Sequence, residues 1–223
     1  MANRKSTNKY YFSVEGETEQ WYLEWLQDVI NNTEQSAYKV SFDCPVQKNP
    51  YKRVKTFIIL KTEKGKVDIY HFSDYESDEP IHIQQFTETM DNLKKANEAG
   101  KFISYKFGYS NLTFDLWIIL HKADCNGPVY HRKNYITHIN RAYEEEFKSM
   151  DEYKHEDNFK RCLGKLQLSN IIDAVNRAKN IMHRNQDSGY ILHQYKGYEY
   201  YKENPSLAIW EAIEKILKDC GLY

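Results

Sequence analysis

The sequence lacks several features that would define its class at once. Its 223 residues carry 31 Lys and Arg against 32 Asp and Glu, so no net charge draws the protein to nucleic acid or to a membrane. This balance still allows a nuclease, because an active site needs only a local field. No apolar run approaches the roughly 18 to 20 residues of a membrane-spanning helix, and we find no repeat and no low-complexity linker.

The cysteines and the first residues exclude two further classes. The four cysteines stand far apart without a C-x-x-C pair, whereas zinc ligation needs closer spacing, so we expect reduced thiols. No apolar segment of the kind found in secretory signals precedes Lys9-Tyr10-Tyr11-Phe12. The sequence therefore predicts a cytoplasmic protein without a membrane partner.

What is abundant is tyrosine. Aromatic residues make up 15% of the chain, with 19 Tyr, and hydrophobic residues at 41% suffice for a full core. Tyrosine suits interfaces as well as cores. Several tyrosines alternate with lysines over residues 190–202, where no helical or strand period is clear. We expect a substrate or partner surface there.

Short β-prone runs alternate with helical periodicity through the first half of the chain. Strands are predicted over residues 9–15, 39–46, 67–72 and 102–107, and helices over 19–30, 53–64 and 81–99, with a further helix opening at 116–120. This alternation predicts an α/β fold with a mostly parallel sheet of about four strands flanked by helices. Beyond it, helices are predicted over 135–150, 169–185 and 206–220. We therefore expect an α/β core over residues 1–121 and a mainly helical part over 122–223 packed on it.

Acidic side chains follow two of the predicted strands. Glu15 ends the first strand, and Asp74 and Glu76 follow the third, with Asp78 just beyond. Ligands of parallel sheets bind beyond the carboxyl ends of the strands, and an acid-x-acid pair on extended backbone places two carboxylates on one side. Oxygen-seeking cations require such ligands, so one or two Mg²⁺ or Mn²⁺ ions could activate water here. The same acids also fit a solvated loop, or, for Glu19, the first turn of a helix.

Three sequence blocks together resemble a known family. The first two have the strand–E-G-x-T-E–helix and strand–D-x-D layout of the Toprim fold, the catalytic module of topoisomerases, primases and overcoming-lysogenization-defect nucleases: Val14-Glu15-Gly16-Glu17-Thr18-Glu19 and Phe72-Ser73-Asp74-Tyr75-Glu76. The third, YSNLTFDLWIILH over residues 109–121, is similar to the S-N-P-x-F-E-x-W-x-x-x-H run of the RloB/AbiLii family. Those Toprim-like proteins are encoded beside an ATPase in bacterial restriction and abortive-infection loci. Asn204-Pro205-Ser206 is similar to that family's C-terminal segment.

The resemblance implies roles for the matching residues. Glu15 would be a general acid/base or metal ligand, and Asp74 with Glu76 the metal-binding pair. The further candidate ligands are Asp78 and Asp115, and the supporting residues are Glu19, Asn111 and His121. Asn111 also fits a turn or helix N-cap, and His121 a hydrogen-bonded buried histidine. The sequence departs from the family pattern at Glu76, Leu112 and Asp115, which leaves a reduced activity open.

The resemblance implies a divalent-metal-dependent nuclease, acting on DNA or RNA as the effector of an anti-phage or abortive-infection system. Its partner would be an ABC/SMC-like or AAA-type ATPase, and a homo-oligomer is compatible with the sequence. Candidate nucleic-acid contacts, which also fit an ordinary solvated surface, are Lys106, Arg177, Arg184 and Lys196. The alternative is a catalytically reduced subunit that binds nucleic acid or the ATPase. A topoisomerase is disfavoured because the chain has no room for the domains that gate a strand, and a primase because no zinc module is present.

Overall fold

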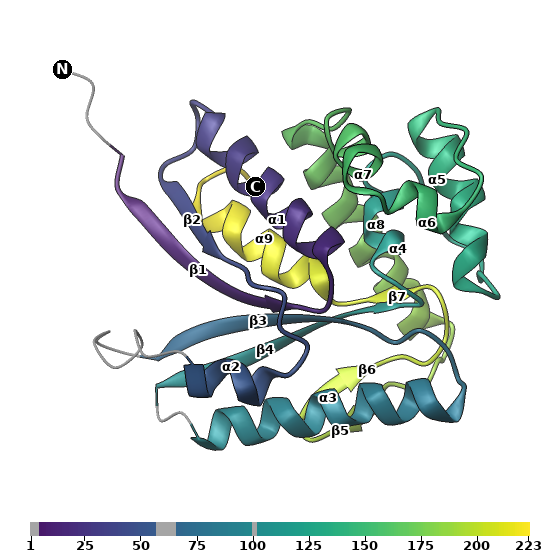
Figure 1. Cartoon of the computed structure of the whole chain (residues 1–223), viewed down its shortest axis with the longest axis horizontal. Coiled ribbons are helices and arrows are strands. Elements are labelled where there is room, and N and C mark those ends of the chain that lie inside the picture. Colours follow the sequence, from purple (N-terminus) through teal and green to yellow (C-terminus); the bar gives the residue numbers. More distant parts are fainter. Residues whose placement is uncertain (1–4, 57–65, 100–101) are drawn as a thin grey trace.

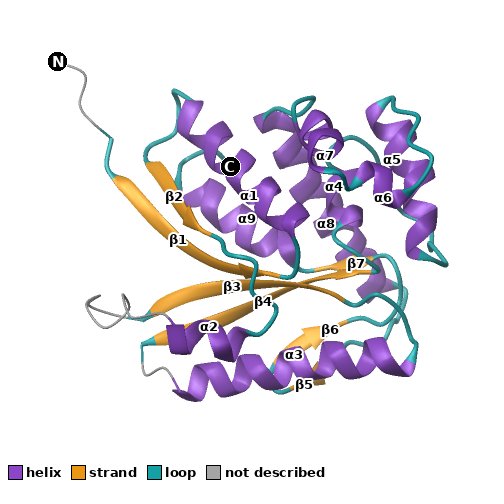
Figure 2. Cartoon of the chain, in the orientation of Figure 1, coloured by secondary structure: helices purple, strands orange, loops and turns teal. Residues whose placement is uncertain are grey.

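A central sheet divides the molecule into two helical layers (Figure 1). The computed structural model describes residues 5–56, 66–99 and 102–223. Helices α1 (Glu17–Asn32) and α9 (Ile209–Asp219) cover one face of the sheet, and α2 (Pro50–Thr56) and α3 (Pro80–Ala99) cover the other (Figure 2). The remaining helices gather on the α1 side, beyond the carboxyl ends of the parallel strands (Figure 1).

The sheet has five strands in the order β2-β1-β3-β4-β7. Their bounds are β1 Thr7–Val14, β2 Lys39–Asp43, β3 Val67–Asp74, β4 Ile103–Asn111 and β7 Ser206–Leu207. The first four are parallel, and β7 pairs antiparallel with the end of β4. In the register, Val14 of β1 lies beside Phe72 of β3, and Asp74 lies beside Ser110 of β4. Three neighbouring strands therefore end at one edge of the sheet.

The C-terminal part is mainly helical. Its elements are a 3-10 turn η2 at Arg132–Asn134, the helices α5 Tyr135–Tyr143, α6 Met150–Tyr153, α7 Glu156–Leu163 and α8 Leu168–Asp187, and the hairpin β5 His193–Tyr195 with β6 Tyr198–Tyr200. Helix α4 (Asp115–Leu120) connects β4 to this part and is buried along its whole length. Because β7 joins the sheet and α9 packs against β4, the C-terminal part completes the core.

Alternation along the strands builds a core on each face of the sheet. Phe12 and Phe72 lie in the large core beneath α1 and α9, whereas Tyr11 and Ile69, which stand one and three positions before them, lie in the core on the α3 side. This is the two-residue period of a strand buried on both faces. The Phe12 ring is central, with its centroid 5.6 Å from that of Phe72.

The structure confirms the predicted α/β class, the mostly parallel sheet, its flanking helices and the helical C-terminal part. It adds β7 as a fifth strand. It also extends β4 beyond the predicted end at residue 107, because Gly108 lets the chain pass close to Phe72: a Cβ at Gly108 would lie 2.9 Å from the Phe72 ring. The predicted helix over 53–64 appears as α2, and residues 57–65 lie outside the described residues.

Two predictions for the C-terminal half were wrong in detail, and some elements there were not predicted. The helix predicted over 135–150 ends at Tyr143, because Glu144 adopts a left-handed conformation with φ 54° that breaks the helical path. Helix α7 was not predicted. Residues 206–207 form a strand rather than the start of a helix, and residues 193–200 form a hairpin. The four cysteines are buried and free, and no helix within the described ranges has the length and hydrophobicity to cross a membrane.

The position of Phe12 predicts a large loss of stability on truncation. Phe12 is 0% exposed, whereas Phe102 is 54% exposed, so Phe12→Ala removes a packed ring and Phe102→Ala does not. We expect Phe12→Ala to lower the free energy of unfolding by about 3–5 kcal/mol and Phe102→Ala by less than about 1 kcal/mol, measured by urea unfolding. Similar losses for the two variants would contradict this description of the core.

Candidate active site

The sheet brings Glu15 and Asp74 into contact. Since β1 and β3 are parallel neighbours, the residues that follow their ends lie side by side. The Ser73 hydroxyl donates a hydrogen bond of 2.8 Å to Glu15 Oε1, and the Asp74 backbone N–H donates one of 3.3 Å to Glu15 Oε2. The Glu15 carboxylate is thus fixed against the carboxyl end of β3.

Two more carboxylates join this pair. Glu19 lies in the first turn of α1 and is only 5% exposed, and its Oε2 accepts a hydrogen bond of 2.9 Å from the Thr18 hydroxyl. Gly16 makes room for it, since a Cβ there would lie 2.9 Å from Glu19 Oε2. Asp115, the first residue of α4, is 1% exposed. We call Glu15, Glu19, Asp74 and Asp115 the carboxylate cluster.

Burial perturbs the ionisation of this cluster. Burial raises the pKa of Glu15 to about 7, against the hydrogen bonds from Ser73 and Asp74 that lower it. Burial, followed by the negative charges of Glu19 and Glu15, raises the pKa of Asp74 well above its ordinary value. The pKa of Glu19 is raised as well, again chiefly by burial. Burial, together with the repulsion between the acids, therefore favours the protonated forms of these carboxyl groups.

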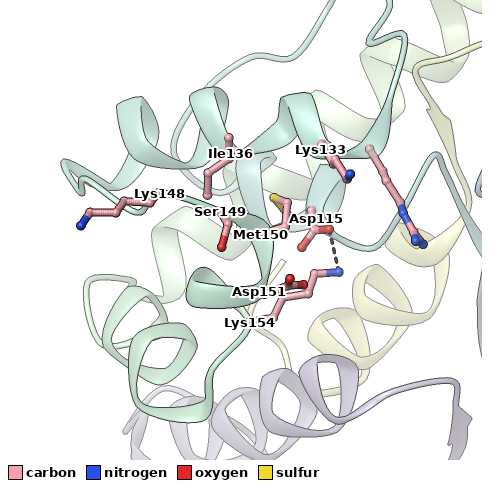
Figure 3. Close-up of a pocket in the computed structure, with 9 residues that line it drawn as sticks. Asp115, Lys133, Ile136, Lys148, Ser149, Met150, Asp151 and Lys154 are labelled. Atoms are coloured by element: carbon pink, nitrogen blue, oxygen red, sulfur yellow. Dashed lines mark ion pairs between the residues drawn. The ribbon is translucent and has the colours of Figure 1, made fainter.

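Lys154 is the cation that contacts the cluster. Its Nζ lies 2.9 Å from Asp115 Oδ2, which also accepts a hydrogen bond of 2.7 Å from the Thr113 hydroxyl (Figure 3). Burial lowers the pKa of Lys154, but Asp115, Asp74 and Glu19 outweigh it and raise the pKa above its ordinary value. The other Asp115 oxygen, Oδ1, is buried and has no hydrogen-bond partner within the described structure.

Glu76 lies beyond the end of strand β3 and does not continue its extended backbone. Strand β3 ends at Asp74, and Glu76 has a φ of 63°, so the expected acid-x-acid pair on one side of extended backbone does not form. The Glu76 carboxylate lies 2.9 Å from His82 Nε2 and 3.2 Å from Arg132 Nη1. Even so, Glu15, Asp74 and Glu76 line one cavity of about 300 Å³. We call it the carboxylate cavity.

The other predicted acid and the two supporting residues make structural contacts. Asp78 accepts a hydrogen bond of 2.7 Å from the Tyr75 hydroxyl. Asn111 is buried and donates a hydrogen bond of 2.7 Å to the backbone oxygen of Lys202, which ties β4 to the segment before β7. His121 is buried beside Tyr22, with its Nε2 3.1 Å from the Tyr22 hydroxyl. Burial lowers the pKa of His121 to about 4, so the ring is neutral.

The four cations predicted to contact nucleic acid lie apart from the cluster and from one another. Lys106 lies 3.8 Å from Asp68 on the middle of the sheet, and Lys196 lies 3.5 Å from Asp91. Arg177 donates a hydrogen bond of 2.7 Å to the backbone oxygen of Leu120, and Arg184 bonds Asn126. Their role in binding stays a prediction.

Sequence reasoning missed Lys154, which contacts the cluster, and the other cations that line a cavity beside it. Arg132, Lys133, Lys148 and Lys154 line a second cavity together with Asp115. They come from η2 and from the segment around α6, neither of which was predicted. Nothing in their spacing marks them, because the folding of the C-terminal part brings them to the strand ends.

The donor chemistry of the cluster fits a divalent cation. Carboxylate oxygens are the ligands that Mg²⁺ prefers, and the buried Asp115 Oδ1 lacks a partner. Glu19, Asp74 and Asp115 would hold the ion, with Glu15 beside them. As the side chains stand, no three His, Cys, Asp or Glu residues of the described chain are grouped closely enough to hold a metal, so binding requires side-chain rearrangement.

Fold and site together define an α/β protein with an acidic site at the carboxyl ends of parallel strands. A family model described as RloB-like protein matches residues 10–216. Because this match covers most of the chain, the protein belongs to the RloB-like family. No curated protein and no solved structure shows a significant match to the chain.

The raised pKa of Glu15 predicts a pH dependence of stability. Between the ordinary value of 4.5 and about 7, the folded protein binds more protons at Glu15 than the unfolded chain. The unfolding free energy should therefore fall as pH rises through this window. Glu15→Gln should remove about 1–3 kcal/mol of that fall, measured by urea unfolding at a series of pH values. An identical pH dependence in the two proteins would contradict the assignment.

The Lys154–Asp115 ion pair predicts a second effect on stability. Lys154→Met leaves the buried Asp115 without its cation and should lower the unfolding free energy by about 2–3 kcal/mol, since water reaches part of Lys154. Adding Asp115→Asn should recover most of the loss. The matched control is Lys160→Met at the exposed pair with Glu156, which should cost less than about 1 kcal/mol. Equal effects at the two sites would contradict a special role for Lys154.

Proposed function

We propose that this protein is a divalent-metal-dependent nuclease that hydrolyses phosphodiester bonds of DNA or RNA. One observation carries the proposal: three neighbouring strand ends and α1 bring four carboxylates together, of which Glu19 and Asp115 are buried and Glu15 and Asp74 are half-buried. Lys154 is the one cation that contacts them in the described structure. Buried carboxylates in excess are costly unless a cation compensates them. A divalent ion supplies that charge, and when bound it activates water and stabilises charge on a phosphodiester.

Glu15 is suited to move the proton. With a pKa raised to about 7 by burial, the carboxyl group is present in both protonation states near neutral pH, as an efficient general acid or base requires. Ser73 and the Asp74 backbone hold its two oxygens in place. Asp74, Glu19 and Asp115 would then serve as ligands, and Lys154 would keep Asp115 oriented and add positive charge beside the substrate phosphate.

Membership of the RloB-like family supports a defence role for this activity. We propose that the protein acts as the effector of an anti-phage or abortive-infection system together with a partner ATPase. The ATPase would be identified by co-purification with the protein from its native host. A role in defence also explains why the carboxylates must rearrange before they can hold a metal ion, because an effector must be inactive until it is triggered.

One observation favours the alternative, a binding subunit with reduced or lost catalysis. Lys154 already lies against Asp115, at 2.9 Å, and Glu76 pairs with His82 and Arg132. These contacts neutralise carboxylates that would otherwise be free to bind a metal ion. The same purified protein distinguishes the two functions.

Cleavage of plasmid DNA, RNA and tRNA with Mg²⁺ or Mn²⁺ tests the proposal. Glu15→Gln and Asp74→Asn should each lower the cleavage rate by at least about 10²-fold, because they remove the proton carrier and a ligand. Glu17→Gln is the matched control, since Glu17 lies between Glu15 and Glu19 but is exposed. Its rate should equal that of the unmodified protein.

Two results of the cleavage experiment would contradict the proposed nuclease site. If no substrate is cleaved with either metal, alone or with the partner ATPase, the alternative of a binding subunit holds. If cleavage occurs but survives both Glu15→Gln and Asp74→Asn, the reaction takes place elsewhere on the protein.

A further inference from the structure

A second cavity adjoins the carboxylate cluster and is distinct from the carboxylate cavity. It measures about 550 Å³ and is lined by Asp115, Arg132, Lys133, Ile136, Lys148, Ser149, Met150, Asp151 and Lys154. We call it the basic cavity, because four of its lining side chains are cationic and two are acidic. It lies among α4, η2, α5 and α6 (Figure 3).

The charge of the basic cavity favours an anion. Lys133 has no ion-pair partner in the part of the chain that the structure describes, and neither has Lys148. Figure 3 shows Lys133 and Lys154 on the same side of the cavity, on either side of Asp115, while Lys148 extends the opposite way. An anion would therefore bind near Lys133 and Lys154, with Arg132 also on the cavity wall. Phosphate is an anion that Arg and Lys bind through charge-assisted hydrogen bonds.

The remaining wall is apolar. Ile136 and Met150 each bury one side against the large core and line the basic cavity with the other. A bare phosphate would leave this wall unused, whereas a nucleobase would cover it. The volume of about 550 Å³ lies within the range of pockets that enclose a small organic ligand. It suits a single nucleotide and excludes a duplex.

The basic cavity lies next to the carboxylate cavity, because residues that line the two are in contact. Asp115 lines the basic cavity, and its charge acts on Asp74, which lines the carboxylate cavity. Arg132 of the one cavity pairs with Glu76 of the other, at 3.2 Å. A strand with one nucleotide in the basic cavity would thus pass its next phosphate to Glu15 and Asp74.

We propose that the basic cavity binds one unpaired nucleotide of the substrate strand, with its phosphate at Lys133, Arg132 and Lys154 and its base against Ile136 and Met150. The inference rests on the proposed function, because it gives that site a substrate of single-stranded character. It requires the strand to be unpaired at the cleavage position, since a paired base cannot enter the cavity.

Binding measured without metal separates this proposal from the nuclease activity. Calorimetric titration of the full chain in EDTA at low salt would compare uridine 5′-monophosphate with uridine and with inorganic phosphate. The nucleotide should bind at least about tenfold more tightly than either fragment, a difference of about 1.4 kcal/mol. Comparison with the 2′-deoxy nucleotide shows whether the cavity prefers RNA or DNA.

Two substitutions test the cationic wall and the apolar wall of the basic cavity separately. Lys133→Ala should weaken nucleotide and phosphate alike, by about tenfold, and Met150→Gln should weaken the nucleotide but not phosphate. Arg141→Ala is the matched control, because Arg141 is an exposed cation of α5 that does not line the cavity. It should change nothing.

Two results would overturn the proposal: a nucleotide that binds no more tightly than phosphate, or binding that Lys133→Ala leaves unchanged. Neither depends on catalysis. If the protein cleaves nothing but the nucleotide binds as expected, the basic cavity stands as a binding site and only the nuclease proposal fails. If the protein cleaves nucleic acid but no nucleotide binds, the nuclease proposal stands and the proposed nucleotide site fails.

Discussion

The structure depends on how one buried negative charge is held at the end of a parallel sheet. Asp115 begins α4 directly beyond β4 and is almost wholly buried, and the ammonium group of Lys154 lies 2.9 Å from it. This pair does more than neutralise charge. It joins α6 to the start of α4, and so fixes part of the helical layer onto the edge of the sheet where the ligands of α/β folds bind.

The parallel register explains why the acids gather where they do. Strands β1, β3 and β4 lie side by side, so a residue that follows each strand reaches the same edge. Two glycines make the close approach possible: Gly16 leaves space for the Glu19 carboxylate, and Gly108 lets β4 pass the Phe72 ring. The cost of burying these acids, with the repulsion between them added to it, appears as raised pKa values for Glu15, Glu19 and Asp74. Carboxylates with pKa values raised in this way favour a bound cation or a bound proton over the free, charged form.

The local pattern was enough to predict the mostly parallel sheet and the acids that follow its strands, because strand ends are encoded within a few residues. The contact between Glu15 and Asp74 also requires β1 and β3 to be neighbours, and the order of strands in a sheet has no such local signal. Glu76 could not be placed this way, since its direction depends on a single backbone angle and on contacts with His82 and Arg132. Lys154 was beyond sequence reasoning for another reason. Its position is set by Tyr153, a fully buried ring between Phe147 and Phe159, and such packing has no short-range signature.

The pairing of β7 with β4 has a consequence for how the protein is made. Ser206 and Leu207 complete the sheet beside Asn111 and Ser110, and Asn111 bonds the backbone of Lys202, directly before the stretch that leads to Asp115. A ribosome-bound chain that has emerged only as far as α8 contains every acid of the cluster but not the segment that holds the end of β4. The site is therefore completed late in translation, only after β7 and α9 have emerged and paired with β4.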